Sequence, residues 1–596
     1  MAEQLLAWLS AINHFLWGPW TPFVLLAAGV LFTVWTKFAQ FRIIAHGFRV
    51  LRGEYDHPDD PGAINHFQAL SAALSATIGL GNIGGVALAI GLGGPGALLW
   101  MWIVGFLGIA LKTIEITLTM LYRNTDEPNE PHGGAMWVID QTLGQRPGWR
   151  AVGKGLGGFF CVSCLIMTMA GGNMFQSWNV AELTNTYFEV PQVATGIVMA
   201  VLVGMVILGG IKRIGHVAGR LVPVMCCLYV LSALAVLAVH VADLPAIIQL
   251  VVTRAFSSTD AGGAFLGSTA GWAFSMGMRR ALFSNEAGLG SAPIAHAAAR
   301  TDEPAREGIV GGIGPLVDTL IICTLTALVI IATGTWNRPP EGPMNGPVQL
   351  VHQDESVRLV APTSVDALPE LADWERYHVG EQVFFVLDTA DPTQPDQRRR
   401  VRLFGEIVGD EKSNPATIDW EAPADIATRL GWNHFPSDVR LAPGSDGEPE
   451  SRVFRDFKGA SLTAHAFDRA FPGLGKWLIT LGAWLFALST MISWSYYGEQ
   501  STYYLFGRRG IVPYKLAFCV FAILGTVWVN TDKQLGNLID FGLGWMLWAN
   551  LFIILIMSPK AVRTLRDYFR RLSAGEFEHH AAASLTDLVE GKDRDA

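Results

Sequence analysis

Residues 67–92 constrain this chain most, because they form an apolar stretch without one charged residue that is interrupted by Gly-Leu-Gly-Asn-Ile-Gly at residues 79–84. Glycines that open a helix at bilayer depth expose backbone groups where no water can satisfy them. Such a break persists only where it lines a cavity or binds something. A second interruption, Asn-Glu-Ala-Gly-Leu-Gly-Ser at residues 285–291, stands in a later apolar segment. Two broken hydrophobic segments at corresponding places in two halves are typical of a secondary transporter.

The glycines at residues 79–84 also match GxGxxG, the pattern of dinucleotide-binding loops. That interpretation needs a preceding strand, a following helix and an acidic residue further on, all within a soluble βαβ unit. The apolar surroundings supply none of these. We therefore set the nucleotide site aside and expect no nucleic-acid partner.

Composition places the chain in a membrane. Hydrophobic residues make up 51% of the 596 residues and charged residues only 16%, whereas a soluble domain carries about a quarter charged residues. Apolar runs of about 17 to 25 residues predict eleven spans of the lipid bilayer in an all-α polytopic protein. The first run follows no Lys or Arg, and we interpret it as a retained helix rather than a signal peptide. The runs begin near Gly18, Phe67, Gly96, Gly155, Val193, Leu221, Ala264, Gly308, Gly475, Val512 and Gln534.

The basic residues of the loops predict the orientation. They gather on one side, as at Arg49, Arg52, Arg508 and the segment after residue 559, and positively charged loops stay in the cytoplasm. We expect the N-terminus outside, the C-terminus inside, and a location in the inner (plasma) membrane. The expected parts are residues 1–335 with spans 1 to 8, residues 475–558 with spans 9 to 11, and a cytoplasmic tail at residues 559–596.

Residues 336–474 form the one long polar segment, which the orientation places outside the membrane. Alternating patterns at residues 381–387 and 400–405 predict a small β-rich ectodomain. It is richer in acidic than in basic residues and has no cysteine, so a disulfide framework or a zinc site in it is excluded. An acidic soluble cap is the plain interpretation; gathering substrate or binding a partner, which the sequence does not identify, is the alternative.

Other motifs carry no enzyme chemistry. Cys161 and Cys164 have CxxC spacing, but they lie in an apolar helix and suit packing rather than metal binding. His579 and His580 in the tail are interpreted as surface residues rather than ligands. The sequence has no nucleophile elbow, HExxH motif or Walker loop. We therefore expect no enzyme activity and no organic cofactor.

Four segments, at residues 79–87, 93–97, 282–293 and 489–498, together resemble the alanine or glycine:cation symporter family. Two features differ from that family. Gly-Gly-Ala-Met-Trp at residues 133–137 stands where the family has Gly-Gly-Pro-Met-Tyr, and the ectodomain is an insertion that typical members lack.

The resemblance implies a leucine-transporter-like fold of two inverted five-helix repeats, preceded by one extra N-terminal helix. The second and seventh spans then become the two broken core helices. It also implies sodium-coupled import of small neutral amino acids, alanine or glycine foremost, by alternating access. The alternative is an amino-acid-binding membrane sensor that signals through the ectodomain without transport.

Physical chemistry and the resemblance together suggest a substrate site at the breaks. Freed N–H groups at a helix break suit a carboxylate, polar side chains near the end of the fourth span could reach an ammonium group, and the aromatic beside the second break could close the pocket or only pack. The expected substrate-binding residues are Gly79, Leu80, Gly81, Asn173, Gln176, Phe283, Asn285 and Gly288.

By the resemblance, two sodium sites are expected. One would use the Thr77 carbonyl, the Asn82 amide oxygen and the Ser284 hydroxyl. The other would use the carbonyls of Ser75 and Ile78 with the hydroxyls of Ser489 and Thr490. The alternative for each hydroxyl is a hydrogen bond to a carbonyl of its own helix.

Charged residues at bilayer depth need a reason to be there. Asp318, in an apolar stretch after the second break, is a candidate cation ligand, with hydrogen bonding to a neighbouring helix as the alternative. Lys112 and Glu115 are three residues apart and suggest a structural or gating pair. Arg279 and Arg280 precede the second break and suggest an extracellular gate against a carboxylate.

Overall fold

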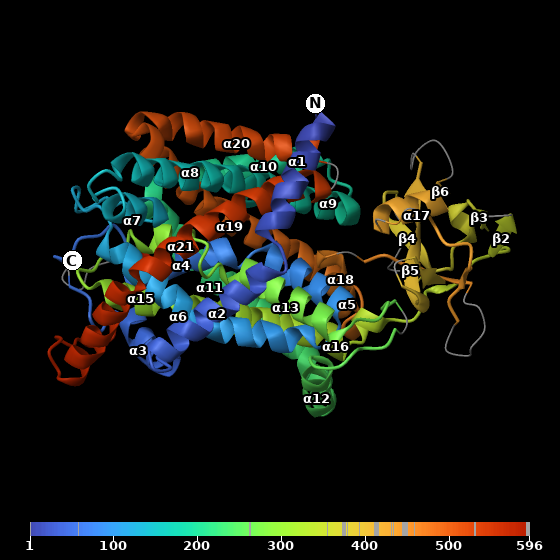
Figure 1. Cartoon of the computed structure of the whole chain (residues 1–596), viewed down its shortest axis with the longest axis horizontal. Coiled ribbons are helices and arrows are strands. Elements are labelled where there is room, and N and C mark those ends of the chain that lie inside the picture. Colours follow the sequence, from blue (N-terminus) through green and yellow to red (C-terminus); the bar gives the residue numbers. More distant parts are fainter. Residues whose placement is uncertain are drawn as a thin grey trace.

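The computed structural model of this chain is a long bundle of helices with a small β-rich domain at one end (Figure 1). The C-terminus lies at the opposite end of the bundle. The chain leaves the bundle after α16 (Thr324–Ala332) and re-enters it at α18 (Ala460–Ala470), so the β-rich domain is an insertion. The structure describes residues 2–57, 59–261, 264–353, 356–371, 377, 379–392, 394–409, 416–430, 432, 434–443, 451–457, 459–529 and 532–591.

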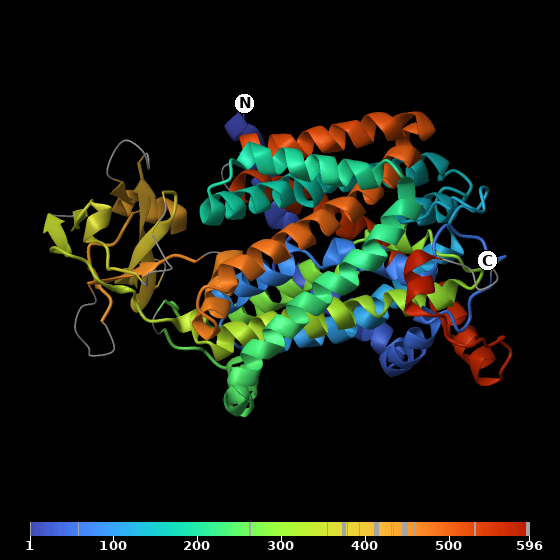
Figure 2. The same ribbon diagram turned by 180° about the vertical axis from the view of Figure 1, so that it is seen from behind.

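Most of the bundle is built from apolar helices. Before the insertion these are α1 (Ala2–Leu16), α2 (Trp20–Trp35), α3 (Gln40–Leu51), α4 (His66–Thr77), α5 (Val86–Gly93), α6 (Ala97–Leu121), α7 (Ala135–Thr142), α8 (Arg150–Met169), α9 (Phe175–Phe188), α10 (Gln192–Ile207), α11 (Gly210–Val239), α12 (Leu244–Arg254), α13 (Ala270–Asn285), α14 (Ala292–His296), α15 (Pro304–Gly311) and α16. After it come α18, α19 (Gly475–Phe506), α20 (Ile511–Trp528), α21 (Asp532–Ser573) and α22 (Leu585–Glu590). Figure 2 shows α11 crossing the back of the bundle obliquely toward α12.

Shorter helical segments interrupt or join these helices. Three are π-helical: η1 (Gly81–Gly85), η2 (Ala170–Met174) and η4 (Leu316–Cys323). The 3-10 segments are η3 (Val241–Asp243), η5 (Thr335–Asn337), η6 (Val365–Ala367) and η7 (Arg508–Gly510).

The chain is a polytopic membrane protein. Within the described ranges, eight helices are long and apolar enough to cross a membrane, or nine if α4 and the bent segment after it count as one span. The fifth and seventh expected spans correspond to α10 and α13, which have 16 residues each. The count of eleven spans therefore stays a prediction.

Small residues let α6 and α15 approach closely. A Cβ atom on Gly308 would lie 2.0 Å from the hydroxyl oxygen of Thr117, and one on Gly312 would lie 2.3 Å from that of Thr113. Membrane helices associate through such close packing because lipid gives them no hydrophobic drive to associate. The contact fixes α15, and with it η4, against the third expected span.

Both breaks expected from the sequence are present. The axes of α4 and the η1–α5 segment meet at 55° across residues 78–80. In the second broken segment α13 ends at Asn285, Glu286 adopts a left-handed conformation with φ of 52°, and α14 begins at Ala292. The two breaks thus correspond to the two glycine-containing interruptions of the sequence.

The inserted domain has two antiparallel sheets. In the larger one the order is β1-β8-β4-β5-β6, with β7 also paired to β4; β2 and β3 form a separate two-stranded sheet. The expectation of strands at residues 381–387 and 400–405 is confirmed. The strands are β1 (Gly342–Pro343), β2 (Gln349–Gln353), β3 (Ser356–Val360), β4 (Gln382–Asp391), β5 (Gln394–Val408), β6 (Thr417–Trp420), β7 (Val439–Leu441) and β8 (Arg452–Arg455), and helix α17 (Pro423–Leu430) also belongs to the domain.

Strand β4 is buried on both faces. Val383 and Phe385 point into the core of the inserted domain, whereas Phe384 packs with Phe454 and with Ala264 of the loop before α13. The guanidinium of Arg402 donates to the carbonyl of Ala264 at 2.8 Å. This second apolar face attaches the sheet to the end of the bundle.

Candidate functional site

Asn82 joins the first break to two other parts of the bundle. Its side-chain oxygen accepts a hydrogen bond from the backbone N–H of Gly79 at 3.3 Å. Its amide nitrogen donates to the hydroxyl of Ser284 at 3.0 Å and to the carbonyl of Asp318 at 3.2 Å. The side chains of Asn82, Ser284 and Asp318 are all buried. The structure therefore brings together three of the residues expected to bind a cation, although it directs the amide nitrogen of Asn82 toward Ser284 and Asp318, and the expected oxygen toward Gly79.

The carboxylate of Asp318 is the only charged group of this trio. Its Oδ1 atom lies 3.5 Å from the Ser284 hydroxyl and accepts a hydrogen bond from Thr319. Its Oδ2 atom is buried and has no hydrogen-bond partner among the described residues. An unpaired buried carboxylate oxygen is costly unless a cation compensates it. The adjacent Thr319 was missed in the sequence, although its position beside Asp318 was a usable signal.

The second expected cation site also comes together in part. The hydroxyls of Ser489 and Thr490 donate to the carbonyl of Ser75 at 3.4 and 3.2 Å, and the Ser75 hydroxyl donates to the Ser489 carbonyl at 2.6 Å. The Ser489 hydroxyl also donates to the carbonyl of Phe486 in its own helix at 2.9 Å, which is the alternative expected for each hydroxyl. The hydroxyl of Thr77 bonds to Leu74 of its own helix at 3.3 Å, and the N–H of Ile78 also donates to Leu74. Ser75 thus meets Ser489 and Thr490 near the end of α4, although they are more than 400 positions away in the chain.

The expected ammonium-binding residues lie near α20. The amide nitrogen of Asn173, in η2, donates to the carbonyl of Phe518 at 2.7 Å, and that of Gln176 donates to Gly171 at 3.0 Å. The side-chain oxygens of Asn173 and Gln176 are buried and have no hydrogen-bond partner within the described ranges. Two amide oxygens are therefore free to accept from a bound ligand.

π-Helical geometry marks these candidates. Asn82 lies in η1, Asn173 in η2 and Asp318 in η4. A π-helical turn widens a helix locally and occurs frequently at functional sites. The sequence alone gave no sign of this geometry at Asn173 and Asp318.

The second break is held by two charged side chains of α6. Lys112 donates to the carbonyl of Asn285 at 2.7 Å, while the carboxylate of Glu115 accepts from the N–H groups of Gly288 and Gly290 at 3.0 and 2.8 Å. Asn550 of α21 donates to the same carboxylate at 2.6 Å. Lys112 and Glu115 therefore bond to backbone groups at the break.

Phe283 lies on another side of α13. Its ring stacks on that of Trp17, with the centroids 5.5 Å apart. This contact agrees with packing, which was the alternative to closing the substrate pocket. The side-chain amide of Asn285 packs closely against Gly108 of α6. A Cβ atom on Gly108 would lie 3.1 Å from the amide nitrogen.

Arg280 precedes the second break in the sequence, and in the structure its side chain lies against the first break. A Cβ atom on Gly85 would lie 2.0 Å from its Cζ atom, so the guanidinium covers the glycine face of η1. The Nε atom of Arg280 is buried and has no hydrogen-bond partner in the part of the chain that the structure describes. A guanidinium whose Nε atom has no partner among the described residues thus lies beside Gly81 and Gly85.

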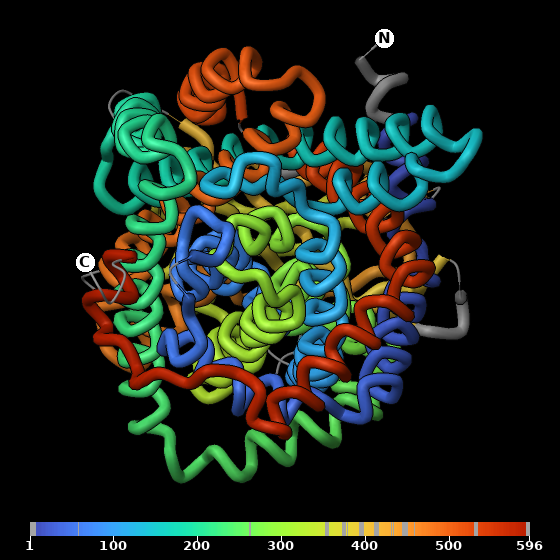
Figure 3. Tube along the Cα trace, turned by 90° about the vertical axis from the view of Figure 1, so that its left-hand side faces the viewer, coloured from blue at the N-terminus to red at the C-terminus, as the bar shows by residue number. Residues whose placement is uncertain are grey.

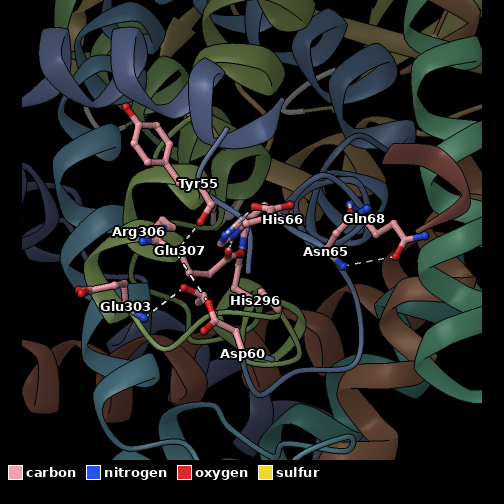
Figure 4. Close-up of polar contacts among 12 residues, drawn as sticks. Tyr55, Asp60, Asn65, His66, Gln68, His296, Glu303, Arg306 and Glu307 are labelled. Atoms are coloured by element: carbon pink, nitrogen blue, oxygen red, sulfur yellow. Dashed lines mark hydrogen bonds and ion pairs between the residues drawn. The ribbon is translucent and has the colours of Figure 1, made fainter. Parts of the chain in front are cut away.

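A buried acid–histidine cluster closes the other end of α4 (Figure 4). Glu307, at the start of α15, bonds to Nδ1 of His66 through one oxygen and to Nδ1 of His296 at 2.5 Å through the other. All three side chains are at most 1% exposed. Nearby, the guanidinium of Arg306 donates to the carbonyl of Tyr55 at 2.9 Å. The sequence did not predict this cluster, in which His66 is 241 positions from Glu307.

Comparison with known families gives a match over most of the chain. The model of the sodium:alanine symporter family matches residues 2–356 and 448–582. The unmatched residues 357–447 contain most strands of the inserted domain. The matched ranges include both breaks and every candidate residue above.

Individual relatives agree with this match. The sodium/alanine symporter AgcS of Methanococcus maripaludis is 31% identical over 554 residues, which cover 93% of this chain and 95% of that protein. An uncharacterised transporter of Bacillus subtilis, YflA, is 41% identical over 56% of this chain and 69% of its own length. The "Probable sodium/glutamine symporter GlnT" of Bacillus subtilis is 36% identical over 56% of this chain and 68% of its own length.

Proposed function

Since this chain belongs to the sodium:alanine symporter family, we propose that it imports small neutral amino acids, alanine and glycine foremost, by alternating access driven by a sodium gradient. Alanine follows from the name of the family and of the relative that matches almost end to end. Sodium is the coupling ion that both names give. Glutamine, named for another relative, is the competing substrate to be tested.

The proposed architecture is the leucine-transporter-like one, with eleven spans and two inverted five-helix repeats after the first span. The two broken helices would be the first core helix of each repeat. In the proposed orientation the N-terminus and residues 336–474 lie outside the inner membrane, and residues 559–596 lie in the cytoplasm. The polar insertion and the basic C-terminal segment at opposite ends of the bundle support this orientation (Figure 1).

The observation that carries the proposal is the meeting of Asn82, Ser284 and Asp318 at the first break. Sodium is a hard cation that favours oxygen ligands. The Thr77 carbonyl, the hydroxyls of Ser284 and Thr319 and the Asp318 carboxylate with its unpaired oxygen would supply them. The Asn82 amide oxygen would join this set by turning from Gly79 toward the ion. The second sodium ion would sit at the carbonyls of Ser75 and Ile78 and the hydroxyls of Ser489 and Thr490.

For the substrate carboxylate we propose two partners, the backbone N–H groups of Leu80 and Gly81 and the guanidinium of Arg280. Arg280 is partly buried, and its Nε atom is buried without a hydrogen-bond partner among the described residues; a carboxylate bound there would provide that partner. The unpaired side-chain oxygens of Asn173 and Gln176 support them as acceptors for the ammonium group. Gly79 and the second break, with Asn285 and Gly288, would shape the pocket, and Phe283 would border it.

Uptake of labelled alanine into proteoliposomes tests the proposal, with and without an imposed inward sodium gradient. We expect accumulation only with the gradient, and glycine should compete. Saturable binding without sodium-driven accumulation would favour the sensor. Preferential accumulation of glutamine would keep symport but replace the substrate.

A further inference from the structure

The C-terminal tail crosses the end of the bundle that lies opposite the β-rich domain (Figure 3). After α21 the chain pairs with the loop that follows α3. The backbone N–H of His580 donates to the carbonyl of Glu54 at 2.8 Å, and that of Ala583 donates to the carbonyl of Arg52 at 2.8 Å. The tail is thereby held in an extended course beside residues 52–57.

Beyond this pairing, α22 reaches the start of the broken helix α4. Asn65 and Gln68 form the capping box of α4. The same two side chains donate to the tail, Asn65 to the carbonyl of Leu588 at 2.7 Å and Gln68 to that of Val589 at 3.0 Å. The tail therefore bonds to the residues that define one end of the first broken helix.

Three potential metal ligands meet where the tail begins this course. His57 comes from the loop before α4, and Glu578 and His580 come from the tail. Each offers one ligand atom, and the three atoms lie within 4.8 Å of one another; no other such group of His, Cys, Asp or Glu occurs among the residues that the structure describes. The rings of His57 and His580 contact each other at 79°, with centroids 5.5 Å apart.

The donor set selects the class of metal. Two imidazole nitrogens and one carboxylate oxygen suit zinc and its neighbours in the transition series, whereas magnesium and calcium favour oxygen ligands throughout. His57 and His580 are half-buried and Glu578 is exposed, so an ion can enter from solution. Three protein ligands leave one tetrahedral position for water.

We propose that His57, Glu578 and His580 bind a divalent transition-metal ion, zinc foremost, and that this ion fastens the C-terminal tail across the end of the bundle. The ion would join two segments that are more than 500 residues apart in the chain and would hold α22 against the start of α4. Its consequence for transport rests on the proposed function: α4 would be held in place, and opening of the pathway at this end would become slower.

Metal binding by the purified full-length protein tests the site directly. Zinc titration by calorimetry should show one strong site per chain, and cobalt should give the absorption bands of a tetrahedral complex. We expect His57→Ala, His580→Ala and Glu578→Gln each to weaken zinc binding by about tenfold or more, because even outer-shell partners of a metal contribute roughly 10- to 100-fold. His579→Ala is the matched control, because the neighbouring histidine bonds to Glu54 instead.

Hydrogen exchange of residues 576–590 gives the second measurement. Zinc should slow exchange of this segment in the wild type and in His579→Ala, but not in His57→Ala. Equal zinc affinity in the wild type and all three ligand variants would overturn the site, and unchanged exchange with zinc bound would overturn the fastening. Neither measurement uses transport, so failure of sodium-driven uptake would overturn the proposed function alone.

Discussion

The Nη2 atom of Arg280 lies 2.3 Å from the point where a Cβ atom on Gly81 would stand. No side chain fits there without moving the guanidinium. The two residues belong to the two broken segments, so this contact joins one break to the other. In the proposed mechanism the same guanidinium would hold the substrate carboxylate, and a bound amino acid would therefore bear on both broken helices.

Replacement of Arg280 should selectively weaken substrate binding. A hydrogen bond to a charged group contributes about 1.5–3 kcal/mol, so Arg280→Gln should lower alanine affinity by about 10- to 100-fold. Sodium binding without alanine should persist. Arg279→Gln, on the adjacent exposed residue, is the control and should leave alanine affinity unchanged. Binding of labelled alanine to purified protein measures both, and wild-type affinity in Arg280→Gln would contradict the assignment.

Addition of one methyl group at Gly81 should have a similar effect. Gly81→Ala forces the Arg280 side chain to move, and we expect alanine uptake to fall at least about tenfold through a misplaced partner of the carboxylate. Gly91→Ala is the matched control in α5, because its Cβ atom would lie 3.5 Å from Leu462 in ordinary contact. Equal uptake by the two variants would show that alanine transport does not require the space that Arg280 occupies beside Gly81.

Asp318 should influence sodium and alanine together. Asp318→Asn removes the charge while it keeps the size and one acceptor oxygen. If Asp318 binds sodium, the factor by which sodium raises alanine affinity should fall, and alanine should raise sodium affinity less by the same factor. Alanine binding at several sodium concentrations measures this factor. A lower melting temperature with an unchanged factor would favour a purely structural hydrogen bond.

The hydroxyls of Ser489 and Thr490 should affect sodium dependence. Ser489→Ala and Thr490→Ala each remove an oxygen near the Ser75 carbonyl, so the sodium concentration for half-maximal uptake should rise several-fold. Ser495→Ala is the control on the same helix, because its hydroxyl bonds to Ile492 of that helix at 2.7 Å, whereas the Ser489 hydroxyl bonds to Ser75 as well as to Phe486 of its own helix. If all three variants have the same sodium dependence as the wild type, the two hydroxyls serve only packing.

The inserted domain should be dispensable for transport. A short Gly/Ser linker in place of residues 343–452 should leave sodium-driven uptake measurable, because every proposed ligand lies outside that range. Helix α18 must stay, since the hydroxyl of Thr463 donates to the carbonyl of Ile83 in the first break at 3.2 Å. Loss of uptake in an abundant, correctly inserted deletion protein would make the domain part of the transport cycle.

The sequence predicted those features that depend on a short stretch of neighbouring residues. Glycine interruptions within apolar runs predicted both breaks, and alternation predicted strands β4 and β5. The meeting of Ser75 with Thr490 was also anticipated, but only through the resemblance to a family. Uninterrupted hydrophobicity cannot reveal which face of a helix meets which neighbour.

What the sequence did not predict depends on tertiary contacts. Glu115 was interpreted through its spacing from Lys112, but its partners are backbone amides about 175 positions away, beyond any local pattern. The pairing of Glu307 with His66 spans 241 positions. For Phe283 the sequence left closing of the pocket and packing both open, and it gave no sign of the stacking on Trp17. The two spans of 16 residues show that length alone does not fix the span count.

The first and last strands of the inserted domain pair with each other, with Gly342 opposite Val453. Paired strands lie about 4.8 Å apart, so the chain leaves the bundle and returns to it at almost the same point. A foreign domain with adjacent termini, such as a fluorescent reporter or an epitope module, could therefore occupy this position without separating α16 from α18. The insertion point is therefore a suitable position for a tag, with which the protein can be followed in living cells or purified from membranes.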